Sequence, residues 1–330
     1  MKKSFFINGG AGRVLCSIPA LEYYKDNVAD DVVIVAEAWQ ELFYSSKKLR
    51  NNIWPSNSKG LWDKLKQTEL ISPEPYRLNA YFTQKANLIQ AFDILINDLD
   101  DIPESKPFNL EINKADQVYG YNMIASLKQQ TGKEKAIVFQ PLGSGAKRDG
   151  NFLYDSSGRS FEVRDITRIV DELSKNYAVI LMTNLEIPTD KQMGAVVPND
   201  TNLLQWMGII NACDYFLGCD SMGQHYANAL GKPATVVIGA TYPENISYPG
   251  NKDFTIIDNG KETREYQPFR VTHDFAIERD SEDLMIFDDN VMKQIIDSVE
   301  EKLGKPKSKD VVKSKNKIDN LPLMIQTKKE

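Results

Sequence analysis

The sequence has few of the residues that build metal sites or disulfide frameworks. Its 330 residues include only three cysteines and two histidines. The cysteines, Cys16, Cys213 and Cys219, have no metal-ligand spacing, and their odd number does not suit a disulfide scaffold. They indicate reduced, buried thiols of a cytoplasmic protein. Because His225 and His273 are the only histidines, we do not expect a multi-histidine metal site, and we predict neither a metal nor a bound cofactor.

Long apolar runs are also missing. No run approaches the ~20 residues that cross a bilayer. No early segment combines a basic stretch, an apolar run and a small-residue cleavage site, as a signal peptide would. We therefore expect a cytoplasmic protein without stable membrane insertion. At roughly 100–200 residues per domain, the length suggests two domains.

Charge is unevenly distributed along the chain. Between residues 302 and 330, nine lysines stand against Asp310, Asp319 and Glu330, a local balance of +6 within a net charge of −6. The acidic remainder repels nucleic acid, whereas this tail would attract a polyanion. We predict a basic flexible tail over residues 305–330, because its composition is typical of solvated, disordered chain. Nucleic acid stays open as a partner through this tail but is not favoured.

Strands and helices alternate at the spacing of βαβ units. Continuous apolar runs predict strands at residues 4–8, 31–36, 136–139, 178–182, 215–218 and 234–238. Helical patterns cover residues 14–24, 84–99, 117–130, 163–173, 202–212, 223–230 and 289–303. The alternation predicts an α/β protein with two Rossmann-like parallel sheets. We expect an N-terminal domain over 1–115, an interdomain helix or linker over 116–135, and a C-terminal domain over 136–304 that ends in a helix.

The first strand is followed by the glycine loop Asn8-Gly9-Gly10-Ala11-Gly12-Arg13. In open parallel sheets, ligands bind at the carboxyl ends of the strands. Glycines there allow close approach of the backbone, and the next helix N-terminus favours an anion. Gly10 and Gly12 are therefore candidate donor-binding residues. The loop matches neither the dinucleotide fingerprint nor a P-loop, and a tight strand-to-helix turn explains it equally well.

A second strand-end loop, residues 141–148, combines flexible backbone with a hydroxyl and cations. Ser144 and Lys147 supply the parts of a diphosphate cradle. The alternative is an exposed basic loop. After the strand at 234–238, the loop over 239–244 carries Thr241 and either lines the same cleft or is an ordinary βα loop.

The segment from Gly218 to His225 is the most specific. A strand ends at Asp220, and a helix begins within a few residues, so backbone N–H groups would face a phosphate. Asp220 is equally suited to cap this helix. His225 lies in its first turns and is a candidate for the site or for a buried histidine bonded to the backbone.

Through these residues the sequence resembles glycosyltransferase family 9, the ADP-heptose:lipopolysaccharide heptosyltransferase group. Members open with a strand, a glycine loop and G-D-V-L leading to P-A-L, where this chain has Gly12-Arg13-Val14-Leu15 and Pro19-Ala20-Leu21. Members also carry G-x-D-S-G-x-x-H followed by A-L-G-K-P and, after a strand, G-x-T-x-P. The corresponding residues here are Gly218, Asp220, Ser221, His225, Ala229, Leu230, Gly231, Lys232, Pro233, Gly239, Thr241 and Pro243. The resemblance covers most of residues 4–303 and is strongest over 203–243.

The resemblance implies a GT-B fold whose C-terminal half binds most of a nucleotide-diphosphate sugar. It places Asp220, Ser221 and the backbone through Gly223 against the donor diphosphate, with His225 supporting their loop. The resemblance also implies that the loop of Ser144 and Lys147 faces the nucleotide or its phosphates. Where the family has a lysine before a tryptophan-proline pair, this chain has an insertion over 148–158, and either Lys147 or Arg159 would supply the cation.

Two departures from the family pattern bear on the chemistry. Arg13 occupies the position of an aspartate that is often proposed as the catalytic base, and a guanidinium cannot act as a base at pH 7. Arg13 could instead hold an anionic acceptor or the leaving group, and Glu37, after the second strand, is the candidate substitute base. Met222 replaces the glycine of D-S-G and narrows the room for backbone approach.

These features predict a metal-independent glycosyltransferase. It would move a sugar from a nucleotide-diphosphate sugar to a hydroxyl on a saccharide of lipopolysaccharide-core type or on another anionic acceptor. One alternative is transfer to a different anionic polymer, such as modified DNA. A second is a catalytically inactive sugar-nucleotide-binding or structural protein, which the loss of the family aspartate favours. A dinucleotide-dependent oxidoreductase fits the first strand and loop but lacks the fingerprint.

Overall fold

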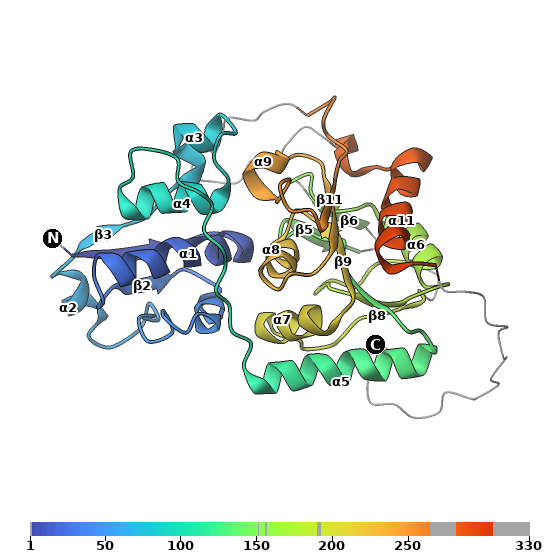
Figure 1. The fold of residues 1–330 in the computed structure, drawn as a ribbon, viewed down its shortest axis with the longest axis horizontal. Helices are drawn as coiled ribbons and strands as arrows, with labels where there is room; N and C mark the ends of the chain where they lie inside the picture. Colours follow the sequence, from blue (N-terminus) through green and yellow to red (C-terminus); the bar gives the residue numbers. More distant parts are fainter. Residues whose placement is uncertain (1, 151, 156, 190–192, 265–281, 306–330) are drawn as a thin grey trace.

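The computed structural model describes residues 2–305 apart from 151, 156, 190–192 and 265–281. Figure 1 shows two α/β halves side by side, the N-terminal one in blue to cyan and the C-terminal one in green to red. Parallel sheets form in both halves, which confirms the predicted fold class. Most of the predicted basic tail lies outside the described residues. No described helix is long and apolar enough to cross a membrane.

The N-terminal half contains a three-stranded parallel sheet in the order β2-β1-β3. Its strands are β1 (Lys3–Ile7), β2 (Val33–Ala36) and β3 (Glu69–Ile71). The other elements are α1 (Ala11–Asn27), η1 (Gln40–Ser45), α2 (Leu61–Leu65), η2 (Pro75–Arg77), α3 (Asn79–Phe82) and α4 (Leu88–Asn97). Ile7 pairs with Ala36 at the carboxyl ends of β1 and β2, so the loops that follow these two strands leave the same edge of the sheet.

The C-terminal half is built on a six-stranded parallel sheet in the order β11-β10-β9-β4-β7-β8. Its strands are β4 (Ala136–Gln140), β7 (Ala178–Leu181), β8 (Ala195–Val196), β9 (Tyr215–Cys219), β10 (Ala234–Ile238) and β11 (Phe254–Asp258). Its helices are α6 (Val163–Leu173), α7 (Leu203–Ala212), α8 (Met222–Ala229), α9 (Pro243–Ile246), η3 (Glu282–Met285) and α11 (Asp289–Leu303). Strands β4, β7, β9 and β10 are buried throughout, as continuous apolar runs in a covered parallel sheet require.

Helix α5 (Lys114–Thr131) follows the N-terminal half and packs along α7 of the C-terminal half (Figure 1). Two glycines set the distance between these helices. A Cβ atom on Gly120 would lie 2.1 Å from the carbonyl oxygen of Gly208, and one on Gly208 would lie 2.1 Å from that of Asp116. The predicted interdomain helix is therefore docked closely on the C-terminal half.

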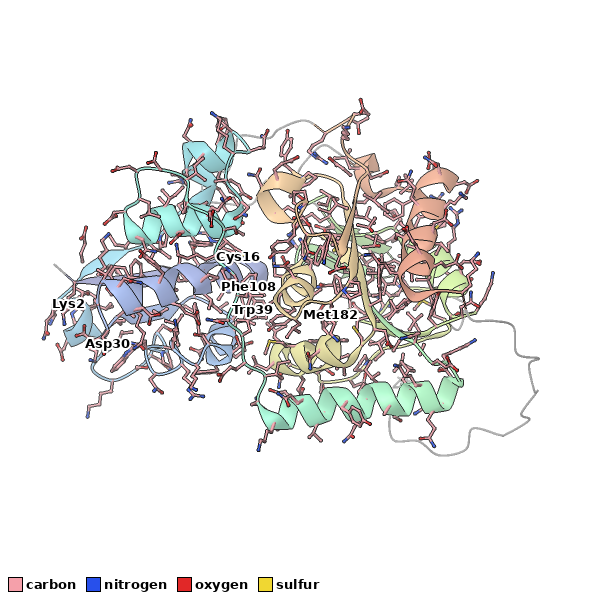
Figure 2. All side chains as sticks on the ribbon, viewed as in Figure 1. Lys2, Cys16, Asp30, Trp39, Phe108 and Met182 are labelled. Atoms are coloured by element: carbon pink, nitrogen blue, oxygen red, sulfur yellow. The ribbon has the colours of Figure 1, made fainter. Side chains whose placement is uncertain are left out.

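The apolar core is continuous between the halves, and Figure 2 labels three of its members, Cys16 and Phe108 of the N-terminal half and Met182 of the C-terminal half. One cluster joins residues of β1, α1 and α4 to residues of β4, α7 and α8, while a second covers the other face of the larger sheet. Helix α1 packs against α8, and η1 packs against α7. These contacts hold the glycine loop before α1 next to the start of α8.

Candidate active site between the two halves

The glycine loop of the N-terminal half lies against side chains of the C-terminal half. A Cβ atom built on Gly10 would lie 3.6 Å from Ser144 Oγ, and one on Gly12 would lie 3.2 Å from the imidazole of His225. Any side chain at position 12 would press on that ring, because Cβ contacts this short are uncommon. The structure thus brings the glycine loop, the 141–148 loop and the 218–225 segment together at one boundary.

Asp220 connects its own segment to Thr241 of the 239–244 loop and to Arg159. It follows β9, is 6% exposed, and accepts hydrogen bonds from Thr241 Oγ1 at 2.9 Å and Gln224 Nε2 at 3.0 Å. The guanidinium of Arg159 lies 4.0 Å from its carboxylate and donates to its backbone carbonyl at 3.3 Å. A buried carboxylate needs such partners, since unpaired buried charge is costly.

Arg159 places a cation at this boundary. Its Nη2 donates to Ser144 Oγ at 3.1 Å, and its Nε donates to Ser157 Oγ at 2.9 Å. Burial disfavours the charged guanidinium, but the nearby carboxylates of Asp220 and Asp155 outweigh this effect and raise the pKa of Arg159. The group therefore presents a fixed positive charge beside the Ser144 hydroxyl.

Lys147 does not join this cluster. The insertion forms an antiparallel hairpin of β5 (Ala146–Asp149) and β6 (Phe152–Asp155), in which Lys147 pairs with Tyr154 and is exposed. Its neighbour Arg148 forms an ion pair with Glu186, after β7. Of the two cations left open by the sequence, the structure brings Arg159 to Ser144 and Asp220.

The start of α8 is held by Gln140, a residue that the sequence reasoning missed. Gln140 Nε2 donates to Ser221 Oγ at 3.0 Å, and its Oε1 accepts from the Gly223 N–H at 2.8 Å. A Cβ atom on Gly223 would lie 2.4 Å from that oxygen. The Gly223 N–H is therefore bonded within the protein, and the contact of the backbone through Gly223 with a diphosphate stays a prediction. A polar residue ending the apolar strand β4 was the available signal.

His225 is a neutral group between α1 and α8. Its Nδ1 lies 2.7 Å from the Tyr248 hydroxyl and 3.6 Å from Cys16 Sγ. Burial lowers the pKa of His225 to about 4, against an opposing effect of Asp220. At neutral pH it packs the loop as an uncharged ring, and it brings no positive charge to the site.

Arg13, which the sequence suggested could hold an anionic acceptor or the leaving group, is paired with a carboxylate of the protein. Its side chain is 8% exposed, and its Nη1 donates to both carboxylate oxygens of Glu74, at 3.1 and 3.2 Å. Nη2 donates to the Pro73 carbonyl at 2.9 Å, and the guanidinium lies over the rings of Tyr76 and Phe92. The Arg13 charge is thus satisfied within the N-terminal half. Glu74 lies in a stretch whose sequence pattern gave no signal for this pairing.

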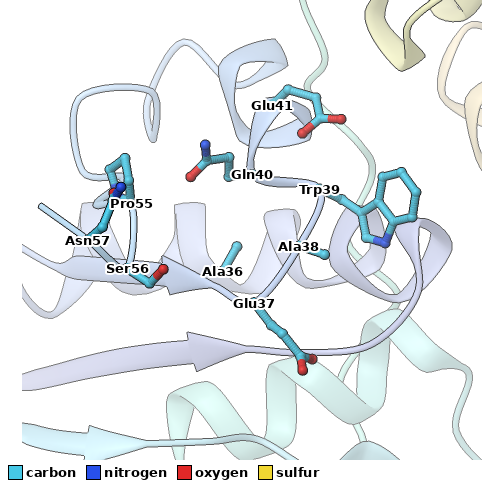
Figure 3. A pocket seen from close by; sticks show the side chains of 9 residues that line it. All are labelled: Ala36, Glu37, Ala38, Trp39, Gln40, Glu41, Pro55, Ser56 and Asn57. Atoms are coloured by element: carbon cyan, nitrogen blue, oxygen red, sulfur yellow. The ribbon is translucent and has the colours of Figure 1, made fainter.

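Glu37 lies where the sequence predicted, at the carboxyl end of β2. Its exposed carboxylate accepts a hydrogen bond from the Gly9 N–H at 3.3 Å. It borders a concavity of about 340 Å³ (Figure 3). The lining residues are Ala36, Glu37, Ala38, Trp39, Gln40, Glu41, Pro55, Ser56 and Asn57.

The described residues contain no group of three or more His, Cys, Asp or Glu side chains that could hold a metal ion. Cys16, Cys213 and Cys219 are free and buried. Burial raises the pKa of the Cys213 thiol to about 12 and also raises those of the other two. The three thiols are therefore protonated at neutral pH and are poor nucleophiles.

Comparison with solved structures places this fold beside known glycosyltransferases. A family 9 glycosyltransferase from Veillonella parvula aligns with a TM-score of 0.59 and 13% identity over 91% of this chain and 96% of its own. The ADP-heptose lipopolysaccharide heptosyltransferase II of E. coli aligns with a TM-score of 0.55 and 14% identity, over 91% of this chain and 98% of its own. The iron-containing dodecameric glycosyltransferase TibC of enterotoxigenic E. coli aligns with a TM-score of 0.57 and 11% identity, over 91% of this chain and 76% of its own.

The chain therefore has the two-domain GT-B fold seen in family 9 glycosyltransferases and heptosyltransferases. At these identities the likeness defines the fold. No known protein-family model matches the sequence, and no curated protein does.

Proposed function

We propose that the protein is a glycosyltransferase that moves a sugar from a nucleotide-diphosphate sugar to a hydroxyl acceptor. The cluster of Ser144, Arg159, Asp220 and Thr241 carries this proposal. It lies at strand ends of the C-terminal half, on the boundary with the glycine loop. The E. coli heptosyltransferase of the same fold is described by its ADP-heptose donor, so ADP is the first nucleotide to test.

The cluster suits a reaction that releases a nucleoside diphosphate. Negative charge grows on the phosphate oxygens as the glycosidic bond breaks, and fixed donors stabilise it. Arg159 would supply the charge and Ser144 a hydroxyl donor, while Asp220 would hold Arg159 and Thr241 in place. A carboxylate also accepts hydrogen bonds from sugar hydroxyls, so Asp220 suits the sugar better than the phosphates. No step of this scheme calls for a metal or a cofactor.

The acceptor proton needs a base, and the N-terminal half offers Glu37 for this role. Its exposed carboxylate is bonded to the glycine loop, whose next residue faces Ser144. Arg13 is excluded as a base by its chemistry, and its partner Glu74 is held by the guanidinium. We accordingly propose Glu37 as the base and an acceptor saccharide bound by the N-terminal half.

A thermal-shift screen of nucleoside diphosphates and their sugars tests the donor assignment. A ligand that binds only the folded state adds RT ln(1 + [L]/Kd), about 2.7 kcal/mol at a hundredfold excess over Kd. We expect stabilisation by one nucleoside diphosphate and by its sugar. A flat response across the whole panel would contradict the proposal.

An inactive sugar-nucleotide-binding protein is the competing assignment, and the neutralised Arg13 at the family aspartate position favours it. Such a protein would bind the same nucleoside diphosphate and its sugar but would form no product. Release of nucleoside diphosphate in the presence of an acceptor separates the two, and Glu37→Gln should abolish that release while leaving donor affinity unchanged.

A further inference from the structure

Asp155 lies at the base of the β5–β6 hairpin, beside the cluster proposed to bind the donor. It is the last residue of β6 and pairs with Ala146, the first residue of β5. The hairpin begins two residues after Ser144 and ends four residues before Arg159. Asp155 therefore closes the segment that separates the two groups assigned to the diphosphate.

One oxygen of Asp155 reaches Arg159 through a serine. Asp155 Oδ1 accepts from the Ser157 N–H at 2.8 Å and from the Ser157 hydroxyl at 2.5 Å. The same hydroxyl oxygen accepts from Arg159 Nε at 2.9 Å, and Arg159 Nη2 donates to Ser144 Oγ at 3.1 Å. Because the hydroxyl proton is used by Asp155, the lone pairs of Ser157 Oγ are left for the guanidinium. Asp155 thus fixes the orientation of the group that holds Arg159.

The other oxygen of Asp155 holds the loop before the hairpin. Asp155 Oδ2 accepts from Ser160 Oγ at 2.6 Å, and Ser160 Oγ accepts from the Gly143 N–H at 2.9 Å. This loop lies close around the carboxylate, since a Cβ atom on Gly145 would lie 2.3 Å from Asp155 Oδ1 and one on Gly143 would lie 3.3 Å from Oδ2. Gly143 and Gly145 flank Ser144, so the carboxylate fixes the backbone on both sides of the Ser144 hydroxyl.

The charge of Asp155 and its hydrogen bonds have opposite consequences for an anionic ligand. Burial by itself would raise the pKa of Asp155, but hydrogen bonds from Ser157 and Ser160 outweigh burial and lower that pKa. The group is therefore a carboxylate at neutral pH and would repel a diphosphate bound nearby. Its hydrogen bonds, in contrast, hold Arg159 in place before a ligand arrives, which reduces the cost of binding.

We propose that Asp155 is a positioning residue of the donor site, acting through Ser157 on Arg159 and through Ser160 on the loop of Ser144. This inference rests on the proposed glycosyltransferase function and names the residue that prepares its diphosphate site. Positioning outweighs repulsion, so loss of this carboxylate weakens the binding of a nucleoside diphosphate.

NMR of the full chain with isotopically labelled arginine tests the positioning without any nucleotide. The Arg159 Nε–H signal is the one missing from Arg159→Ala, and its hydrogen bond to Ser157 slows exchange with water. Asp155→Ala and Ser157→Ala should each speed that exchange about tenfold. Asp149→Ala removes an exposed aspartate of the same hairpin and should leave the exchange rate unchanged. Ser157→Ala keeps every charge and provides the test if Asp155→Ala does not fold.

Calorimetric titration with ADP, UDP and GDP tests the consequence for binding. For the nucleotide that binds the parent, Asp155→Ala should weaken the affinity about fivefold, the scale of one lost hydrogen bond, and Asp149→Ala should leave it unchanged. Ser157→Ala should weaken the affinity about threefold in the parent. In an Arg159→Ala background Ser157→Ala should have no effect, because the partner through which it acts is gone.

Tighter binding in Asp155→Ala would overturn the proposal, since repulsion would then be the main effect of this carboxylate. Equal losses for Ser157→Ala with and without Arg159 would also overturn it, because they indicate a general structural role. The same holds if neither substitution changes exchange at Arg159 Nε. If none of the three nucleotides binds the parent, the proposed function fails, and the exchange rates alone decide whether Asp155 positions Arg159.

Discussion

Arg13 and Glu74 form a two-oxygen ion pair across 61 positions of the N-terminal half. The pair is covered by Tyr76 and Phe92, and Arg13 also holds the Pro73 carbonyl. It joins the start of α1 to the segment before η2. The residue that replaces the family's aspartate therefore has a structural partner, and its role is to fix the segment beside the glycine loop.

Replacing Arg13 with alanine should lower stability. The change removes a buried guanidinium from its carboxylate and both rings, and we expect a loss of about 2 kcal/mol, less than for a fully buried pair because Glu74 is partly exposed. Urea unfolding measures it, with the exposed Arg50→Ala as control. Unchanged stability combined with a large loss of transfer would show that Arg13 acts on a ligand instead.

The crossing of α5 and α7 leaves no room for a side chain. In Gly208→Ala the new methyl group would lie 2.1 Å from the Asp116 carbonyl oxygen, so the helices must separate. We expect destabilisation of about 2 kcal/mol, in the range of overpacked cores. Gly250→Ala is the matched control, since a Cβ there meets nothing within 4 Å. Equal stabilities of the two variants would mean that α5 does not dock as described.

His225 should make stability depend on pH. Burial lowers the pKa of His225 in the folded protein from 6.5 to about 4. Between these two pH values the unfolded chain therefore binds a proton at His225 that the folded protein does not. The free energy of unfolding is not reduced by this group above pH 6.5, and it falls as the pH is lowered towards 4. Between pH 7 and pH 5 the loss is about 2 kcal/mol. Chemical unfolding of the parent and of His225→Gln at both pH values isolates this part. Parallel losses in the two proteins would place His225 in contact with solvent.

Much of the fold could be predicted because its information is local. Helices α6 and α11 begin and end where the apolar period and the flanking residues indicated, and β10 is a single continuous apolar run. Strand β3 was not predicted, because its three residues are mostly exposed and carry no apolar run. The β5–β6 hairpin was not predicted either, since half of its strand residues are polar and most are exposed.

The site could be predicted only as a set of loops. Strand ends on one parallel sheet share an edge, so Ser144, Asp220 and Thr241 could be assigned to one place from the order of elements alone. The choice between Arg159 and Lys147 depended on the path of the hairpin. The hydrogen bond from Gly223 to Gln140 and the ion pair of Arg13 with Glu74 join residues that are distant in the sequence. No local sequence pattern predicts such tertiary contacts.

The central claim is that Arg159 holds the diphosphate of a nucleotide-sugar donor, and calorimetric titration with ADP, UDP and GDP tests it most directly. We predict that one of them binds the parent and that Arg159→Ala weakens its binding at least tenfold, about 1.4 kcal/mol. Arg148→Ala removes an arginine of the insertion that precedes Arg159, one that is paired with Glu186, and should change the affinity less than threefold. Equal affinities in the parent and in Arg159→Ala, or no binding of any of the three, would contradict the account.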